Sequence, residues 1–501
     1  KIVNETNKLS KEEKEKQFAP LEKLIPEKEE KEKTLPEIEI KNTKNVITRL
    51  APEPSKYPHL GHAMSFLLNY LYAKKYNGKC FLKFEDTNPE KVAQEYVDGI
   101  IEDIKNYLEI KFDGIRYVSD DMELLYDYAE KIIEMNKAFM CFCDRDKMQD
   151  LRHKGIECEC RKKSVKINME EWKEFLKGKY MKGEAVLRLK GDMKSQNHVM
   201  RDPVIFRAID ATHYRHGDKY KIWPMYDFYN PIVDSLMGVT LILRSNEFEL
   251  RVELQNHIKD LLKLKKQDIV QYGRFNVLEF TTKGREIRDL IDSGEYIGWD
   301  DPRLITLKAL KRRGITKEAI YELTEQVGLS KKQIHIDFDM IAAINRKIID
   351  KTANRYSFVE NPIKLEIEKK PNIKSVEIPL HPDKKEKQTV KINDIYISKK
   401  DYEEYRGKEI RLLHLYNIQL DKKEKKANFT STENKDIPRI NWVSNPEKVS
   451  ILMPNGEKIE GAAESTIKTL KYNEVIQFER FGFVKLDKKT KGQYEFWFTH
   501  K

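Results

Sequence analysis

The chain has 501 residues, too many for one hydrophobic core, and at about 150 residues per domain it predicts three or four domains. Charged residues make up 35% and apolar residues 39%, and neither an apolar leader nor a run near the ~20 residues of a membrane helix is visible, which argues against a membrane protein. The net charge of +11 is compatible with a polyanionic partner such as nucleic acid, although a Lys/Glu-rich surface is often only solubilising.

Residues 1–44 are dominated by Lys and Glu and predict a charged N-terminal helical arm, for which a solvated appendage without a site is the simpler interpretation. Residues 45–137 then alternate between strand and helix patterns. We expect a buried strand over 46–50, a helix from Gly61 to about Asn77, and a second strand over 80–84. Such a unit has parallel strands and builds a doubly wound, Rossmann-type α/β sheet.

The remaining chain divides by its pattern. A helix is expected to start at residues 88–90 (Asn-Pro-Glu), and strand-like pieces lie within 183–222 and over 239–243. After residue 361 short alternating runs separated by turns predict an all-β region of one or two barrels. We therefore expect the two halves of one catalytic domain at 45–137 and 222–301, with an insertion between them at 138–221. A helical subdomain at 302–350 and β-barrels at 351–501 should follow.

Two histidines follow the first predicted strand. His59 and His62 lie three residues apart in 58–62 (Pro-His-Leu-Gly-His), at the start of a helix where nucleotide phosphates bind in such sheets. Gly61 would let an adenine or ribose approach the backbone, and the imidazoles can donate hydrogen bonds to ATP as charge builds on the α-phosphorus. Two ordinary surface histidines are the alternative, since the bare pattern is common.

These residues resemble the ATP-binding signature of class I aminoacyl-tRNA synthetases. Residues 49–55 (Arg-Leu-Ala-Pro-Glu-Pro-Ser) with 59–62, then 84–89 (Phe-Glu-Asp-Thr-Asn-Pro), 223–228 (Trp-Pro-Met-Tyr-Asp-Phe) and 298–303 (Gly-Trp-Asp-Asp-Pro-Arg) are similar to the glutamyl/glutaminyl subfamily. Residues 477–483 resemble the barrel end of its archaeal and eukaryotic-type members. The resemblance implies ATP with Mg²⁺, the amino acid and tRNA as partners, with ATP against Pro52, His59, Gly61 and His62.

The choice of amino acid rests on Arg244. The subfamily carries Arg at this position in glutamate enzymes and a neutral residue in glutamine enzymes, and a fixed guanidinium would pair with a γ-carboxylate. A structural ion pair with Glu247 is the alternative. The resemblance also assigns a group of residues to the glutamate pocket, with Glu85 holding the substrate ammonium: Arg49, Glu85, Tyr226 and Asn230.

The second ATP motif of the family matches poorly. Residues 281–285 (Thr-Thr-Lys-Gly-Arg) stand where Lys-Met-Ser-Lys-Ser or a variant is expected, so Lys283 or Arg285 is the expected phosphate partner. The register between these two is open. Lys56 also replaces the Gly common in the first motif.

Four of the five cysteines lie close together in the predicted insertion. Two Cys-x-Cys pairs separated by fourteen residues, Cys141/Cys143 and Cys158/Cys160, have the spacing of a tetrahedral zinc knuckle. Four thiolates would fill the metal's coordination, so its role would be structural. Four reduced core cysteines are the alternative. So few cysteines argue against a secreted disulfide scaffold and favour the cytoplasm.

The leading hypothesis is a glutamate–tRNA ligase acting on tRNA(Glu), with the charging of tRNA(Gln) left open. The resemblance implies that residues 202–207 (Asp-Pro-Val-Ile-Phe-Arg) face the tRNA acceptor end. Two alternatives remain, a glutaminyl enzyme, which Arg244 disfavours, and a catalytically silent tRNA- or protein-binding relative, which the degraded second motif keeps open.

Overall fold

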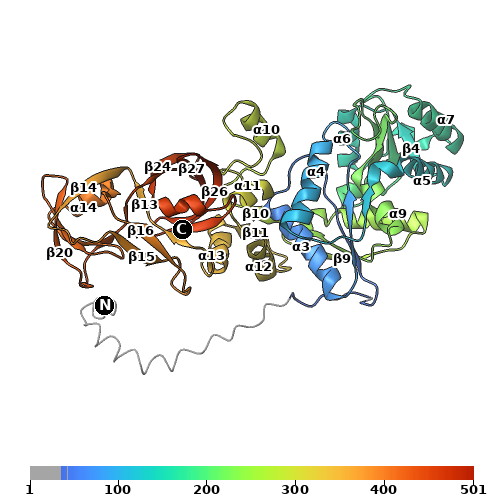
Figure 1. Ribbon diagram of the computed structural model, residues 1–501. Helices are drawn as coiled ribbons and strands as arrows, with labels where there is room; N and C mark the ends of the chain where they lie inside the picture. Colours follow the sequence, from blue (N-terminus) through green and yellow to red (C-terminus); the bar gives the residue numbers. More distant parts are fainter. Residues whose placement is uncertain (1–34, 42) are drawn as a thin grey trace, which may run out of the picture. The chain divides into compact units, whose positions relative to one another are not determined.

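The computed structural model describes residues 35–41 and 43–501 (Figure 1). Most of the expected N-terminal helical arm, residues 1–34 and 42, lies outside the described residues. Its described remainder, 35–41 with 43–44, is irregular rather than helical.

The first layer is a parallel sheet. Strand β2 lies between β1 and β3 with parallel pairing on both sides, and β8 pairs with β9 in the same sense. Thr240, next to β8, donates its N–H to the carbonyl of Ile47 in β1 at 2.9 Å, which joins the two groups into the order β3-β2-β1-β8-β9. The predicted doubly wound sheet is confirmed. Its strands are β1 (Ile47–Leu50), β2 (Lys79–Phe84), β3 (Ile115–Tyr117), β8 (Leu241–Ser245) and β9 (Asp268–Tyr272).

The first crossover helix, α3 (Leu60–Lys75), ends as predicted, with Asn77 at φ 51° where the chain turns back. The helix predicted at 88–90 starts later, and that prediction is wrong. Residues 89–91 form only a turn, and the Ala93 N–H donates to the carbonyl of Pro54 at 3.2 Å, which holds this stretch against the nucleotide-motif loop. Helix α4 (Gln94–Glu102) follows and continues as the π-helical turn η1 (Asp103–Tyr107).

Between β3 and β8 the chain builds an antiparallel sheet in the order β4-β5-β6-β7, packed against a core that contains Trp172 and Phe206. Its strands are β4 (Ala138–Cys141), β5 (Val186–Leu189), β6 (Val204–Ala208) and β7 (Ile222–Pro224). The helices of this stretch are η2 (Val118–Asp121), α5 (Met122–Glu134), α6 (Arg145–Lys154), η3 (Glu159–Lys162), α7 (Val165–Leu176), η4 (His198–Met200) and α8 (Tyr226–Leu236).

Apart from β9, the chain after β8 is mainly helical up to about residue 350. The parallel pair β10 (Phe275–Val277) and β11 (Ile334–Ile336) lies within this part. Its helices are η5 (Asn246–Phe248), α9 (Arg251–Leu262), α10 (Gly284–Asp292), α11 (Leu307–Arg313), α12 (Lys317–Val327) and α13 (Phe338–Ile349). The helical pattern predicted for 302–350 corresponds to α11, α12 and α13. Among the described residues, none of the helices is long and apolar enough to cross a membrane.

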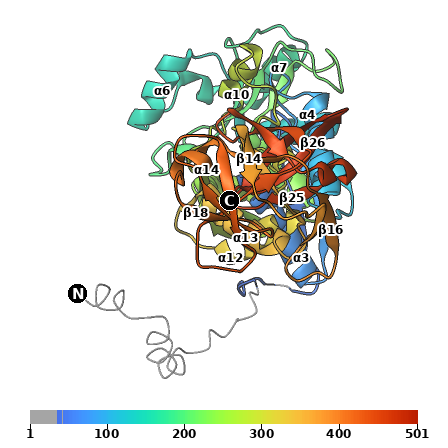
Figure 2. The same cartoon turned by 60° about the vertical axis from the view of Figure 1, so that its left-hand side comes forward.

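The C-terminal part consists mainly of strands, as predicted, and contains two seven-stranded sheets and the two-stranded sheet β15-β16 (orange to red in Figures 1 and 2). In each seven-stranded sheet the two edge strands are consecutive in the chain and one residue apart, at Ser357 and at Asn441. Edges joined so closely require the sheet to curl round into a barrel.

One barrel has the order β12-β25-β26-β27-β23-β24-β13, and the other β21-β18-β19-β20-β14-β17-β22. The bounds are β12 (Arg355–Tyr356), β13 (Phe358–Glu360), β14 (Pro362–Glu368), β15 (Ser375–Pro379), β16 (Lys387–Lys391), β17 (Ile395–Ser398), α14 (Lys399–Glu404), β18 (Glu409–Leu412), β19 (Asn417–Leu420), β20 (Lys426–Ser431), β21 (Arg439–Ile440), β22 (Trp442–Val443), β23 (Glu447–Leu452), β24 (Lys458–Ala463), η6 (Ser465–Thr469), β25 (Val475–Phe478), β26 (Gly482–Thr490) and β27 (Gln493–His500).

Candidate active site

A cavity of about 580 Å³ opens where β1, β2 and β8 end and α3 begins. This is the edge at which doubly wound sheets bind ligands. Most of the residues singled out from the sequence share it. Those lining it are Arg49, Pro52, His59, Gly61, His62, Glu85, Tyr226, Arg244 and Lys283, whereas Asn230 and Arg285 are not part of the lining.

Both histidines of the first motif are half-buried, and their hydrogen bonds select one tautomer. The Gly61 N–H donates to His59 Nδ1 at 3.1 Å, and the His59 N–H donates to His62 Nδ1 at 3.2 Å. Burial lowers the pKa of His62 to about 3 and that of His59 well below its usual range, with the charges of Lys56 and Arg274 acting in the same direction. Because each Nδ1 accepts, the proton of the neutral ring sits on Nε2, which makes each imidazole a fixed donor.

A chain of buried charges joins the ends of β1, β2 and α8. Arg49 Nε donates to Asp234 Oδ2 at 3.1 Å, and Lys83 Nζ lies 2.7 Å from Asp234 Oδ1 and 3.2 Å from Glu85 Oε1. Asn230 Nδ2 donates to the same oxygen of Glu85 at 2.8 Å. Burial raises the pKa of Glu85, and the charges of Lys83 and Arg49 oppose that shift. The two cations and two anions therefore balance, and Glu85 keeps a carboxylate edge at the cavity wall.

Arg244 is a buried cation outside this charge network. It is 5% exposed, and Nη1 donates to the neutral Gln255 Oε1 at 2.9 Å and lies 3.5 Å from the hydroxyl of Tyr226. Its Nε and Nη2 are buried and have no hydrogen-bond partner among the described residues. Glu247, the partner considered from the sequence, contacts Arg274 instead, with Oε2 3.1 Å from Nη1. A guanidinium with two unused donors at a cavity wall is built to receive a carboxylate.

The second motif contributes little charge to the cavity. Lys283 occupies the N-cap position of α10, but its side chain makes no capping bond: it is 78% exposed, with its Nζ 2.7 Å from Glu286 Oε1. Arg285 is exposed and outside the lining. Lys56 of the first motif also lines the cavity, and its Nζ donates to the carbonyl of Thr282 at 2.8 Å.

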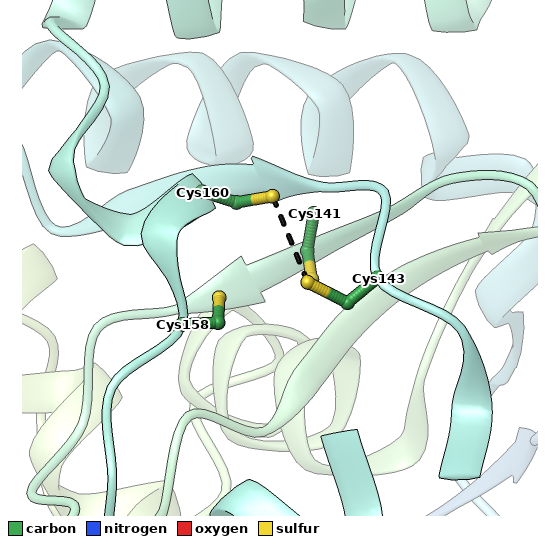
Figure 3. Close-up of side chains that lie close together, drawn as sticks. All are labelled: Cys141, Cys143, Cys158 and Cys160. Atoms are coloured by element: carbon green, nitrogen blue, oxygen red, sulfur yellow. Dashed lines mark hydrogen bonds between the residues drawn. The ribbon is translucent and has the colours of Figure 1, made fainter. Parts of the chain in front are cut away.

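The four clustered cysteines point toward one another from two segments (Figure 3). Cys141 is the last residue of β4 and Cys143 follows it, while Cys158 directly precedes η3 and Cys160 lies within it. All four Sγ atoms are within 4.8 Å of one another, with Cys143 and Cys160 3.9 Å apart. Zn–S bonds of about 2.3 Å in a tetrahedron place sulfurs about 3.8 Å apart, so this donor set fits Zn²⁺.

Asp202 connects this cysteine loop to the sheet of the insertion. It is fully buried and accepts from Arg161 Nε and from the Gly191 N–H, both at 2.9 Å. A Cβ on Gly191 would lie 1.9 Å from the carbonyl of Met200, so only glycine allows this approach. The carboxylate of Asp202 is therefore used for contacts within the protein, where it links the cysteine loop to the sheet.

Sequence reasoning missed Lys83, Asp234 and Gln255. Asp234 lies four residues after Asn230 on α8, so the helical period places both on the face that also carries Tyr226. Lys83 is a charge in an otherwise apolar strand pattern, which was a usable signal. Gln255 carried none, because an amide on a helix is ordinary.

Comparison with known proteins agrees with this geometry. Residues 45–351 match the family model described as "tRNA synthetases class I (E and Q), catalytic domain", and residues 353–436 and 425–487 match two models of the corresponding anti-codon binding domain. A glutamate–tRNA ligase of Thermococcus onnurineus is 39% identical over 100% of this chain and 91% of its own length. The enzymes of Pyrococcus abyssi and Methanocaldococcus jannaschii are 40% and 37% identical, over 97% and 100% of this chain and 89% and 91% of theirs.

Proposed function

The chain belongs to the class I tRNA synthetases for glutamate and glutamine, and from this premise we propose that it is a glutamate–tRNA ligase. In the first step an oxygen of the glutamate α-carboxylate attacks the α-phosphorus of ATP, and pyrophosphate leaves. In the second step a hydroxyl of the terminal adenosine of tRNA(Glu) attacks the acyl carbon, and AMP leaves. The carboxylate is already ionised, so the site must supply alignment and charge stabilisation rather than a strong base.

The observation that carries the choice of glutamate is the unpaired guanidinium of Arg244. Nε and Nη2 can form a two-pronged, charge-assisted contact with the γ-carboxylate of glutamate. The amide of glutamine would bring no charge, so the buried cation would stay uncompensated at a cost of several kcal/mol.

Other residues of the cavity take complementary roles in this proposal. Glu85, oriented by Asn230, accepts the substrate ammonium, and Arg49, fixed through Nε by Asp234, directs the rest of its guanidinium to the amino acid. Tyr226 completes the pocket beside Arg244. Bound Mg²⁺ supplies further neutralisation of the triphosphate.

The histidines act on the nucleotide. His59 and His62 present neutral Nε2–H donors toward ATP, and neutral donors give up no proton as charge builds on the α-phosphorus. Gly61 and Pro52 line the same cavity. The second motif places Lys283 at the outer rim, and Arg285 has no role in the proposal.

We assign residues 138–221 to the tRNA acceptor end and 351–501 to the anticodon region, with 45–137 and 222–301 as the catalytic halves and 302–350 as a helical connector. Cys141, Cys143, Cys158 and Cys160 hold a structural Zn²⁺ that stiffens the insertion. The related tRNA ligases make the cytoplasm the expected location.

The test is aminoacylation with purified protein, glutamate, ATP-Mg²⁺ and tRNA(Glu), with tRNA(Gln) charged side by side to define the tRNA range. Folded protein that transfers no glutamate would refute the proposal. The variant Arg244→Cys should lose glutamate activation far more than glutamine activation, measured as ATP–pyrophosphate exchange with tRNA present. Equal losses would remove Arg244 from the selection of substrate.

A further inference from the structure

Lys56 lies at the seam between the two nucleotide motifs. Its Nζ reaches the second motif at the carbonyl of Thr282, while Arg288 Nη1 of α10 reaches back to the carbonyl of Ser55 at 3.1 Å. A Cβ at Gly284 would lie 3.2 Å from Lys56 Cδ, so the absence of a side chain at 284 leaves room for the lysine stem. The two loops are thus joined in both directions, with Lys56 on the cavity side.

The ammonium of Lys56 has no anionic partner in the part of the chain that the structure describes. Among the described residues its hydrogen-bond partner is a neutral carbonyl, and no carboxylate forms an ion pair with it. Burial lowers its pKa, and the nearby charges of Arg274 and Arg288 lower it further, against the opposing charge of Glu53. A partly buried ammonium with two unused N–H donors beside the histidines suits an anionic group in the cavity.

The second-motif cations are placed differently. Lys283 is mostly exposed and already paired with Glu286, and Arg285 lies outside the lining. We propose that Lys56, on the first-motif loop, provides the ammonium that contacts the phosphates of ATP and takes the place of a second-motif lysine. This inference rests on the proposed function and adds a substrate-contacting residue to it.

The test is calorimetric binding of a non-hydrolysable ATP analogue with Mg²⁺, and separately of adenosine, without tRNA or glutamate. Lys56→Met should weaken binding of the analogue by about 10- to 100-fold, the size of one hydrogen bond to a charged group, and leave adenosine binding within about two-fold. Lys56→Gln, which keeps a donor for Thr282 but removes the charge, should show the same selective loss. The matched control Lys283→Met should lose about three-fold or less.

Several results would overturn the inference. Unchanged analogue binding by Lys56→Met would do so, as would wild-type binding by Lys56→Gln, because the charge would then be irrelevant. Parallel losses of analogue and adenosine would show a merely structural role for Lys56. A larger loss in Lys283→Met would return the contact to the second motif. Wild-type protein that binds no analogue at all would instead refute the proposed function.

Discussion

Replacing Arg244 by Met should separate the stability of the protein from its use of glutamate. The wild-type guanidinium keeps two buried donors without partners, and each such group costs about 1–3 kcal/mol. The substitution removes both, leaves the acceptor Gln255 Oε1 unpaired in exchange, and loses one further hydrogen bond, the long 3.5 Å contact with the Tyr226 hydroxyl. The surplus of one donor predicts that the free protein becomes more stable by about 1–3 kcal/mol.

The same change should cost most of the affinity for glutamate. Truncating one partner of a buried charge pair costs about 2–5 kcal/mol, which corresponds to an increase of roughly 30-fold or more in the KM for glutamate. We expect the KM for ATP to stay within about two-fold, since Arg244 binds the other substrate.

Two assays on the same preparation check the prediction. Calorimetric unfolding without ligands should show a higher Tm for Arg244→Met, by roughly 2–4 °C per kcal/mol. ATP–pyrophosphate exchange with tRNA present should show the loss for glutamate. The matched control is Arg116→Met, because Arg116 is paired with Asp121 at 2.6 Å and lies outside the cavity, so its loss should lower Tm slightly and leave both KM values unchanged. A lower Tm with an unchanged KM for glutamate would refute the reasoning about Arg244.

Three further outcomes are expected. Gln255→Glu places a carboxylate against the guanidinium of Arg244, so the KM for glutamate should rise about ten-fold or more, and an unchanged KM at pH 8 would contradict this. Cys158→Ser should remove roughly one zinc ion per chain by elemental analysis and open residues 138–221 to trypsin, with ATP binding retained, whereas wild-type zinc content would exclude the site. The pKa of His62 is about 3 when folded against about 6.5 when unfolded, so the unfolded state binds more protons between these values and stability falls as pH drops below 6.5, by up to ~1.4 kcal/mol per unit. His62→Gln should flatten that pH dependence in urea unfolding, and equal slopes would show that His62 is not its source.

The elements that the sequence predicts well are those with a local pattern. The switch from alternating to helical spacing locates β1, α3 and β2 within a few residues. The start of α4 escapes such reasoning, because the contact of Ala93 with Pro54 decides it and spans 39 residues. Closure of the barrels is equally non-local, since β12 and β13 flank Ser357 but pair with distant strands, Arg355 with Gln477 and Phe358 with Ala463.

The same difference between local patterns and non-local contacts applies to the candidate site. Histidines, glycines and cysteines at fixed spacing identify a nucleotide cavity and a metal cluster, because those chemistries need neighbours in sequence. Lys83 and Asp234 meet only through the fold, and no spacing rule relates residues 151 positions apart. The role proposed for Lys56 in phosphate binding depends likewise on the position of the second-motif loop. The sequence shows only that a lysine replaces a glycine.

The ion pair between Lys83 and Asp234 also has a consequence for folding during synthesis, because it can form only after both residues have been added to the chain. A ribosome that adds about 5–20 residues per second delivers Asp234 roughly 8–30 s after Lys83. During that interval β2 carries a lysine destined for full burial with Glu85 as its only carboxylate from the network, and β1 lacks its neighbour near Thr240. The antiparallel sheet β4–β7, whose strands pair in sequence order, can fold in the meantime. The first half of the parallel sheet therefore cannot complete its buried ion pairs until α8 has been synthesised.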